Sequence, residues 1–74
     1  MATNGSELEK LKSLLDYGID HNDEHQDEVE EWANTARDLG YDQTGEILAD
    51  ASDKLGEATN LLDDAMKKLN KGGR

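Results

Sequence analysis

The sequence predicts an all-α protein built as a long antiparallel helical hairpin. Apolar residues recur at spacings of three and four over most of the chain, which is the period of a helix face. None of the 74 residues is proline, so nothing forces a break in a long helix. Aromatic and β-branched residues are scarce, which argues against a sheet. High charge with modest hydrophobicity is also typical of disorder, but the regular spacing favours helices.

The first predicted arm covers about residues 7–39. Ser6 and Glu9 fit a capping box, which marks a helix start. Gly40 follows the last periodic residue and suits the left-handed position that ends many helices. The apolar positions that share one face of this arm are Leu8, Leu11, Leu15, Val29, Trp32, Ala36 and Leu39.

The second predicted arm covers about residues 42–70, with Asp42 as its N-cap. Its apolar stripe alternates steps of three and four without a slip: Leu48, Ala51, Leu55, Ala58, Leu62, Ala65 and Leu69. Ile47, Leu61 and Met66 widen that stripe, as in a helix of a bundle. We therefore expect a disordered segment at 1–6, one helical domain at 7–70 and a frayed tail at 71–74.

The segment 18–25 decides between two architectures. Gly18 lowers helix propensity, and Asn22 resembles a fresh helix start, so a break here would give a three-helix bundle. The apolar phase nevertheless runs straight through from Leu15 to Val29, and an unbroken first arm would match the second in length. The hairpin, with a first arm that is continuous or kinked near 18–22, is the interpretation we favour.

A lone hairpin cannot cover both sides of its apolar stripes. Pairing of two hairpins as a C₂ homodimer would cover them in a four-helix bundle, and helices of a partner protein could do the same. We therefore expect a homo-oligomer or a complex with a helical protein.

Charge and composition exclude several classes of partner and chemistry. The net charge of −10 repels phosphate, so neither nucleic acid nor an anionic membrane is an expected partner. No apolar run has the length of a transmembrane helix, and the first residues lack the pattern of a signal peptide, so we expect a cytoplasmic protein. The absence of cysteine removes thiolate metal sites and thiol catalysis.

One polar cluster interrupts the first apolar stripe and suggests metal chemistry. His21 and His25 are one helical turn apart and share a face, and Glu28 extends that face. Two imidazoles and a carboxylate suit Zn²⁺, Ni²⁺ or Cu²⁺. In a hairpin that turns at 40–41, this cluster would lie near Ser52, Gly56 and Asn60, which are small or polar and leave room for a ligand.

The histidines also have a purely structural interpretation. His25 sits at a core position of the heptad and could set helix register as a hydrogen-bonded polar residue. Pairs of histidines four residues apart are common, and this pair lacks the zinc-protease signature. No serine has an evident base partner, and nothing singles out a pair of carboxylates, so we expect no enzymatic activity.

The run from Leu14 to His25, with Glu28 and Trp32-Ala33 after it, resembles a small bacterial and archaeal helical domain of unknown function. That domain carries a His-Asn-x-Glu-His pattern, matched here by His21 to His25, and occurs alone or attached to nickel-binding proteins of the CooT type. The resemblance covers roughly residues 8–69. It implies a helical hairpin associated with metal handling, although the nickel module itself is absent from this chain.

Together these patterns predict a small acidic helical module that self-associates and binds a transition metal, zinc or nickel, through His21, His25 and Glu28. The alternative is a protein-interaction or scaffold domain in which both histidines are structural.

Overall fold

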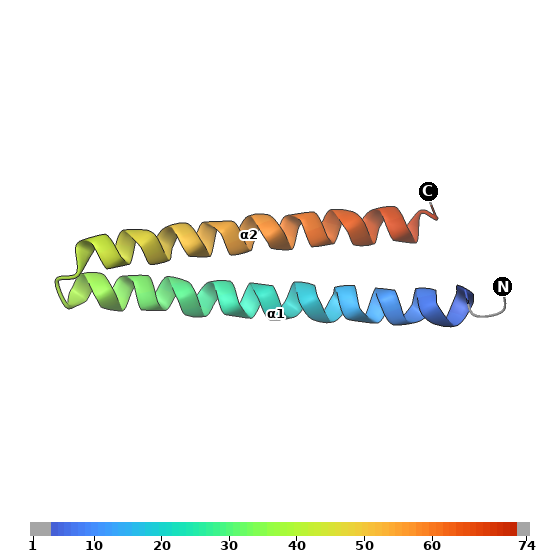
Figure 1. The fold of residues 1–74 in the computed structure, drawn as a ribbon, viewed down its shortest axis with the longest axis horizontal. Helices are drawn as coiled ribbons and strands as arrows, with labels where there is room; N and C mark the ends of the chain where they lie inside the picture. Colours follow the sequence, from blue (N-terminus) through green and yellow to red (C-terminus); the bar gives the residue numbers. More distant parts are fainter. Residues whose placement is uncertain (1–3, 73–74) are drawn as a thin grey trace.

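The computed structural model describes residues 4–72 and contains two helices. Helix α1 runs from Asn4 to Asp38 and helix α2 from Asp42 to Asn70. The helices lie antiparallel and side by side along nearly their whole length, with both chain ends at the end away from the turn (Figure 1). The predicted helical hairpin is confirmed.

The first arm is one unbroken helix, so the three-helix alternative is wrong. At Gly18 an added Cβ would lie 3.9 Å from Cδ1 of Leu62 on α2. Packing against α2 therefore holds this turn in the helix, despite a propensity cost of about 1 kcal/mol for glycine.

The start of α1 differs from the expected one. The helix already includes residues 4–6, where we expected disorder, and Ser6 lies inside it rather than at its cap. Expectations for residues 1–3 and 73–74 fall outside the described part of the chain.

The connection between the helices is a short turn closed by Gly40. Its φ of +92° is left-handed, as expected for a glycine that ends a helix. The Gly40 amide donates to the carbonyl of Arg37 at 2.9 Å, and the Tyr41 amide donates to that of Ala36 at 2.8 Å. These two bonds form a Schellman motif. Asp42 is the first residue of α2, and the cap position falls on Tyr41, which makes no side-chain capping bond.

Small side chains fill the contact between the helices. The buried residues are Val29, Ala33 and Ala36 on α1 and Gly45 and Ser52 on α2. A Cβ on Gly45 would come within 3.0 Å of the Ala33 carbonyl oxygen, so the two backbones approach closely here. Within the described residues, no large side chain is fully buried.

The hairpin is a single layer of two helices. Its principal extents are 58 × 17 × 13 Å and its radius of gyration is 16.8 Å. A globular domain of this length would have a radius of gyration of about 11 Å. One layer has no second surface against which to close a core. Across the described residues, neither helix is long and apolar enough to cross a membrane.

Candidate functional site

Four aromatic rings form a row along α1, which we call the ring row: Tyr17, His21, His25 and Trp32. The Tyr17 and His21 rings stack with centroids 5.5 Å apart, and the His21 and His25 rings stack at 6.1 Å. The edge-on contact between His25 and Trp32 has a centroid distance of 6.0 Å. Steps of four and seven residues put all four rings on one side of the helix.

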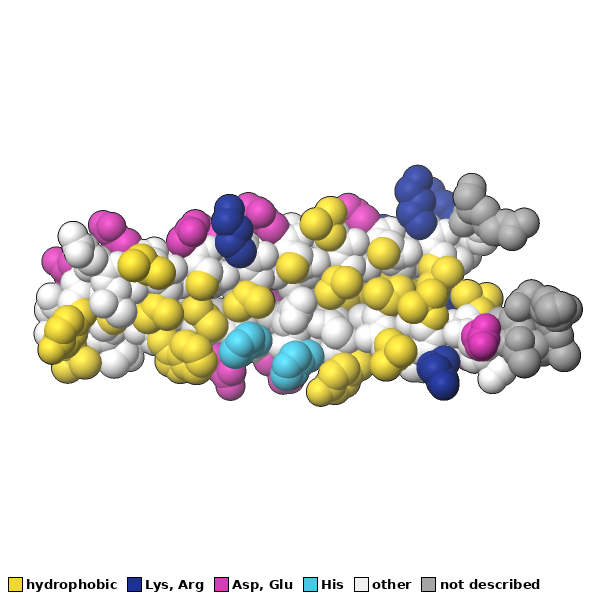
Figure 2. Space-filling view, in the orientation of Figure 1, with side chains coloured by type: hydrophobic (Ala, Val, Ile, Leu, Met, Phe, Trp, Pro, Cys, Tyr) yellow, Lys and Arg dark blue, Asp and Glu magenta, His cyan; other side chains and the backbone are white. Residues whose placement is uncertain are grey.

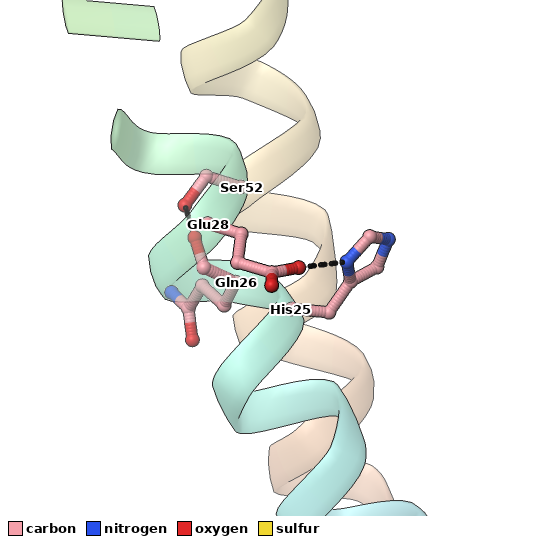
Figure 3. A network of polar contacts seen from close by, with 4 residues as sticks. All are labelled: His25, Gln26, Glu28 and Ser52. Atoms are coloured by element: carbon pink, nitrogen blue, oxygen red, sulfur yellow. Dashed lines mark hydrogen bonds and ion pairs between the residues drawn. The ribbon is translucent and has the colours of Figure 1, made fainter. Parts of the chain in front are cut away.

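Glu28 binds His25 directly. The Nδ1 atom of His25 lies 3.2 Å from Oε1 of Glu28, and the two side chains are 43% and 62% exposed (Figure 3). The second nitrogen of the imidazole points away from this carboxylate. When Nδ1 donates its proton to a carboxylate, Nε2 keeps the lone pair that can bind a metal. This contact resembles the hydrogen bond by which carboxylates orient histidines in known metal sites.

A single chain does not assemble the predicted three-ligand set. Among residues 4–72, no three histidine, aspartate or glutamate side chains converge on one point as a metal site. The imidazole planes of His21 and His25 are nearly parallel, at 17°, so their nitrogens do not yet face one position. Both rings would have to turn about their side-chain bonds to share an ion.

The residues expected opposite the histidines face Gln26 instead. The Ser52 hydroxyl donates to the carbonyl of Gln26 at 3.3 Å, on the side of α1 away from the His25 ring (Figure 3). A Cβ on Gly56 would meet the Gln26 amide nitrogen at 2.8 Å. Asn60 lines a shallow polar recess with Asp23, Gln26 and Asp53, and no ring of the row borders it. Ser52 and Gly56 do lie at the same height along the hairpin as His25. They face its neighbour Gln26, because successive residues of a helix point in directions 100° apart.

The ring row belongs to a wider exposed surface. His25 and Trp32 each precede a residue that packs toward α2, namely Gln26 and Ala33, and Ala51 likewise precedes the buried Ser52. Because the helices are antiparallel, a residue that directly precedes an interface residue lies on the same side of the hairpin in both helices.

We call this side the apolar face: the ring row, Leu14, Ala51, Leu55, Ala58, Leu62 and Ala65. The view in Figure 2 shows hydrophobic side chains along the seam between the helices with both histidines beside them. Acidic side chains lie along the two edges of this view. The exposed side of the second-arm stripe includes Ala51 and Ala65, whereas its leucines at 48, 55, 62 and 69 are half-buried.

A family model described as a domain of unknown function (DUF8180) matches residues 11–69. The chain belongs to this family. The DUF8180 match spans the ring row, the turn and nearly all of α2. It confirms the resemblance to a small domain of unknown function, while the His-Asn-x-Glu-His pattern as a family feature and the attachment to nickel-binding proteins stay predictions. Comparison with curated proteins and with solved structures found no match.

Sequence reasoning missed two members of this site. Tyr17 and Trp32 extend the histidine pair into a row, and their steps of four and seven residues from the histidines were the available signal. Gln26 was missed because nothing in its own neighbourhood distinguishes it from other polar residues. Its role depends on Ser52 and Gly56, which are far away in sequence.

Proposed function

We propose that this domain is a non-enzymatic self-association module, in which two copies pack their apolar faces together as a four-helix bundle. The observation that carries the proposal is the exposure of many large apolar side chains, among them Leu14, Tyr17 and Trp32 of the apolar face. Those at least 39% exposed are Leu8, Leu11, Leu14, Tyr17, Trp32, Leu39, Tyr41, Ile47 and Leu61. An exposed apolar surface on a small protein often marks an interaction site.

The exposed area fits a partner of the same size. The chain exposes 5798 Å², whereas a globular protein of 8.2 kDa exposes about 4,500 Å². The excess of about 1,300 Å² per chain exceeds the roughly 800 Å² that each partner buries in a standard interface. Pairing two hairpins through an interface of that size would therefore remove more than half of the excess.

The apolar stripe of α2, from Leu48 to Leu69, favours a second copy of this chain as the partner over an unrelated helix. Leu48 and Leu62 lie seven residues either side of Leu55, and all three are half-buried at the edge of the apolar face. Two antiparallel copies of α2 centred on Leu55 would bring each Leu48 against a Leu62. Self-complementarity of this kind is what a two-fold interface requires.

Light scattering on a size-exclusion column tests the proposal. We expect a mass of two chains for the unmodified protein and of one chain for Ala51→Glu, which puts a charge on the apolar face. Ser13→Glu is the matched control, because it adds the same charge beside the half-buried Lys12 on the other side of α1. A folded single chain at every concentration would overturn self-association, and assembly only with a different helical protein would favour the scaffold alternative.

A second candidate function is transition-metal binding through His21 and His25 with Glu28. The hydrogen bond between His25 and Glu28 supports it, because metal-binding histidines commonly have such a carboxylate partner. Calorimetric titration with Zn²⁺ and Ni²⁺ should show saturable binding that is lost in the double variant His21→Ala/His25→Ala. Equal binding by the double variant would exclude this cluster.

A further inference from the structure

We infer that the dimer holds one shared transition-metal site on its two-fold axis, with His21 and His25 of each chain as the four ligands. The inference rests on the proposed self-association. Its starting point is that one chain offers two imidazoles on one side of α1 and no third group converging with them among the described residues. A structural zinc site needs four ligands, so two copies of this pair complete it.

The histidine pair lies at the middle of the hairpin. Helix α1 runs from Asn4 to Asp38, which places His21 at its midpoint. The midpoint of the pair itself is Asp23, about 3 Å further along the helix. A two-fold axis perpendicular to the helices must pass near this level if two hairpins are to overlap along their full length.

The α2 stripe has its centre at the same level. Ser52 bonds the carbonyl of Gln26, so these two residues are level across the hairpin. Because the helices are antiparallel, three steps back from Gln26 and three steps on from Ser52 reach Asp23 and Leu55. One axis can therefore pass the centre of the histidine pair on α1 and the centre of the leucine stripe on α2.

This axis gives matched contacts along α1 as well. With α1 against its own copy and a centre at residue 23, His25 lies opposite His21 of the partner subunit. Trp32, which is 50% exposed, then lies opposite Leu14 of the partner subunit. Glu28 lies opposite Gly18 of the partner subunit, where the missing side chain leaves space for the carboxylate and the ring that it orients.

The alternative parallel pairing would place α1 against α2 of the second copy. Each histidine pair would then face a stripe of alanine and leucine, which supplies no ligand. The antiparallel arrangement alone brings four imidazoles together.

The chemistry of such a site suits a divalent transition metal. Four neutral imidazoles bind Zn²⁺, Ni²⁺ and Cu²⁺ more readily than Mg²⁺ or Ca²⁺, which prefer oxygen ligands. Each chain carries a net charge of −10, so two paired chains repel each other and a cation between them reduces that repulsion. Metal binding is therefore expected to strengthen pairing.

Calorimetric titration of the full chain with Zn²⁺, combined with sedimentation equilibrium, tests the inference. We expect saturation at one ion per two chains and at least a tenfold tighter dimer with Zn²⁺ than in chelator. His21→Ala/His25→Ala should abolish binding and yet still dimerise in chelator. Glu57→Gln is the matched control: it removes a carboxylate lining the polar recess and should leave the stoichiometry and affinity unchanged.

The outcomes separate the two proposals. A dimer that binds no Zn²⁺, or one ion per chain, overturns the shared site and leaves self-association standing. If Glu57→Gln weakens Zn²⁺ binding as much as the histidine variant does, the shared site is also overturned. Zn²⁺ would then be attracted diffusely to acidic residues. A single chain under all conditions overturns both proposals.

Discussion

The imidazole of His25 and the carboxylate of Glu28 are joined at 3.2 Å through Nδ1, which leaves the other ring nitrogen free. This relationship changes the role expected for Glu28. If His25 binds a metal as proposed, we expect Glu28 to orient the imidazole rather than to act as a third ligand.

Glu28→Gln should therefore weaken metal binding without abolishing it. An amide still accepts a hydrogen bond from Nδ1 but no longer adds negative charge, and loss of such an outer partner typically lowers metal affinity about 10–100-fold. Both side chains are well exposed, so folding stability should change by less than about 0.5 kcal/mol. Zinc titration and a thermal melt in chelator measure the two effects. Complete loss of binding would instead make Glu28 a direct ligand.

Gly45→Ala should destabilise the hairpin. The new Cβ would lie 2.7 Å from Cγ of Arg37 and 3.0 Å from the carbonyl oxygen of Ala33, so backbone as well as side chain must shift. Overpacking of this kind costs about 1–3 kcal/mol, measured by urea unfolding.

Gly56→Ala is the comparison for that prediction. Its Cβ would meet only the far end of the Gln26 side chain, which can move away. The gain in helix propensity, up to about 1 kcal/mol, should make this variant neutral or more stable. Equal losses of stability in Gly45→Ala and Gly56→Ala would contradict the expectation that the helix contact is less able to adjust at Gly45 than at Gly56.

Gly40→Ala and Gly18→Ala should have opposite effects on stability. At Gly40 the φ of +92° strains any residue with a Cβ, at a cost of about 1–2 kcal/mol. At Gly18 the added methyl would make an ordinary contact at 3.9 Å with Leu62, and alanine should stabilise the helix by about 0.5–1 kcal/mol. Thermal unfolding of both variants decides the matter. A loss of stability at Gly18→Ala would mean that the added methyl group crowds Leu62 or the second copy at this level.

Leu55→Cys should form a disulfide across the dimer. The chain has no cysteine of its own, so any bridge joins the introduced thiols. A residue on the two-fold axis meets its own copy, whereas Asn60→Cys, on the polar recess, should stay reduced under the same mild oxidation. Non-reducing electrophoresis distinguishes them. A bridge in the Asn60 variant and none in the Leu55 variant would contradict the antiparallel arrangement.

Much of the fold was predictable from local pattern. The spacing of Leu15, Val29 and their neighbours predicted helix through Gly18, and Gly40 marked the turn in its left-handed conformation. The start of α1 was not, because the Ser6–Glu9 capping pattern competes with simple extension of the helix by one more turn.

The site was predictable only in part. Helical spacing alone put His21, His25 and Glu28 on one side of α1, and the ring contacts bear this out. Spacing could not say that Gln26, rather than His25, faces Ser52 and Gly56. That depends on how far each helix is rotated about its own axis, which the spacing within one helix does not specify.

In the proposed dimer, a second copy covers the apolar face, including the exposed Leu14, Tyr17 and Trp32. Sedimentation equilibrium of the unmodified chain in chelator tests this most directly. We expect a mass approaching twice 8.2 kDa that falls toward that of one chain on dilution. A mass of 8.2 kDa at every concentration, from a chain whose circular dichroism shows a fully formed helix, would contradict it.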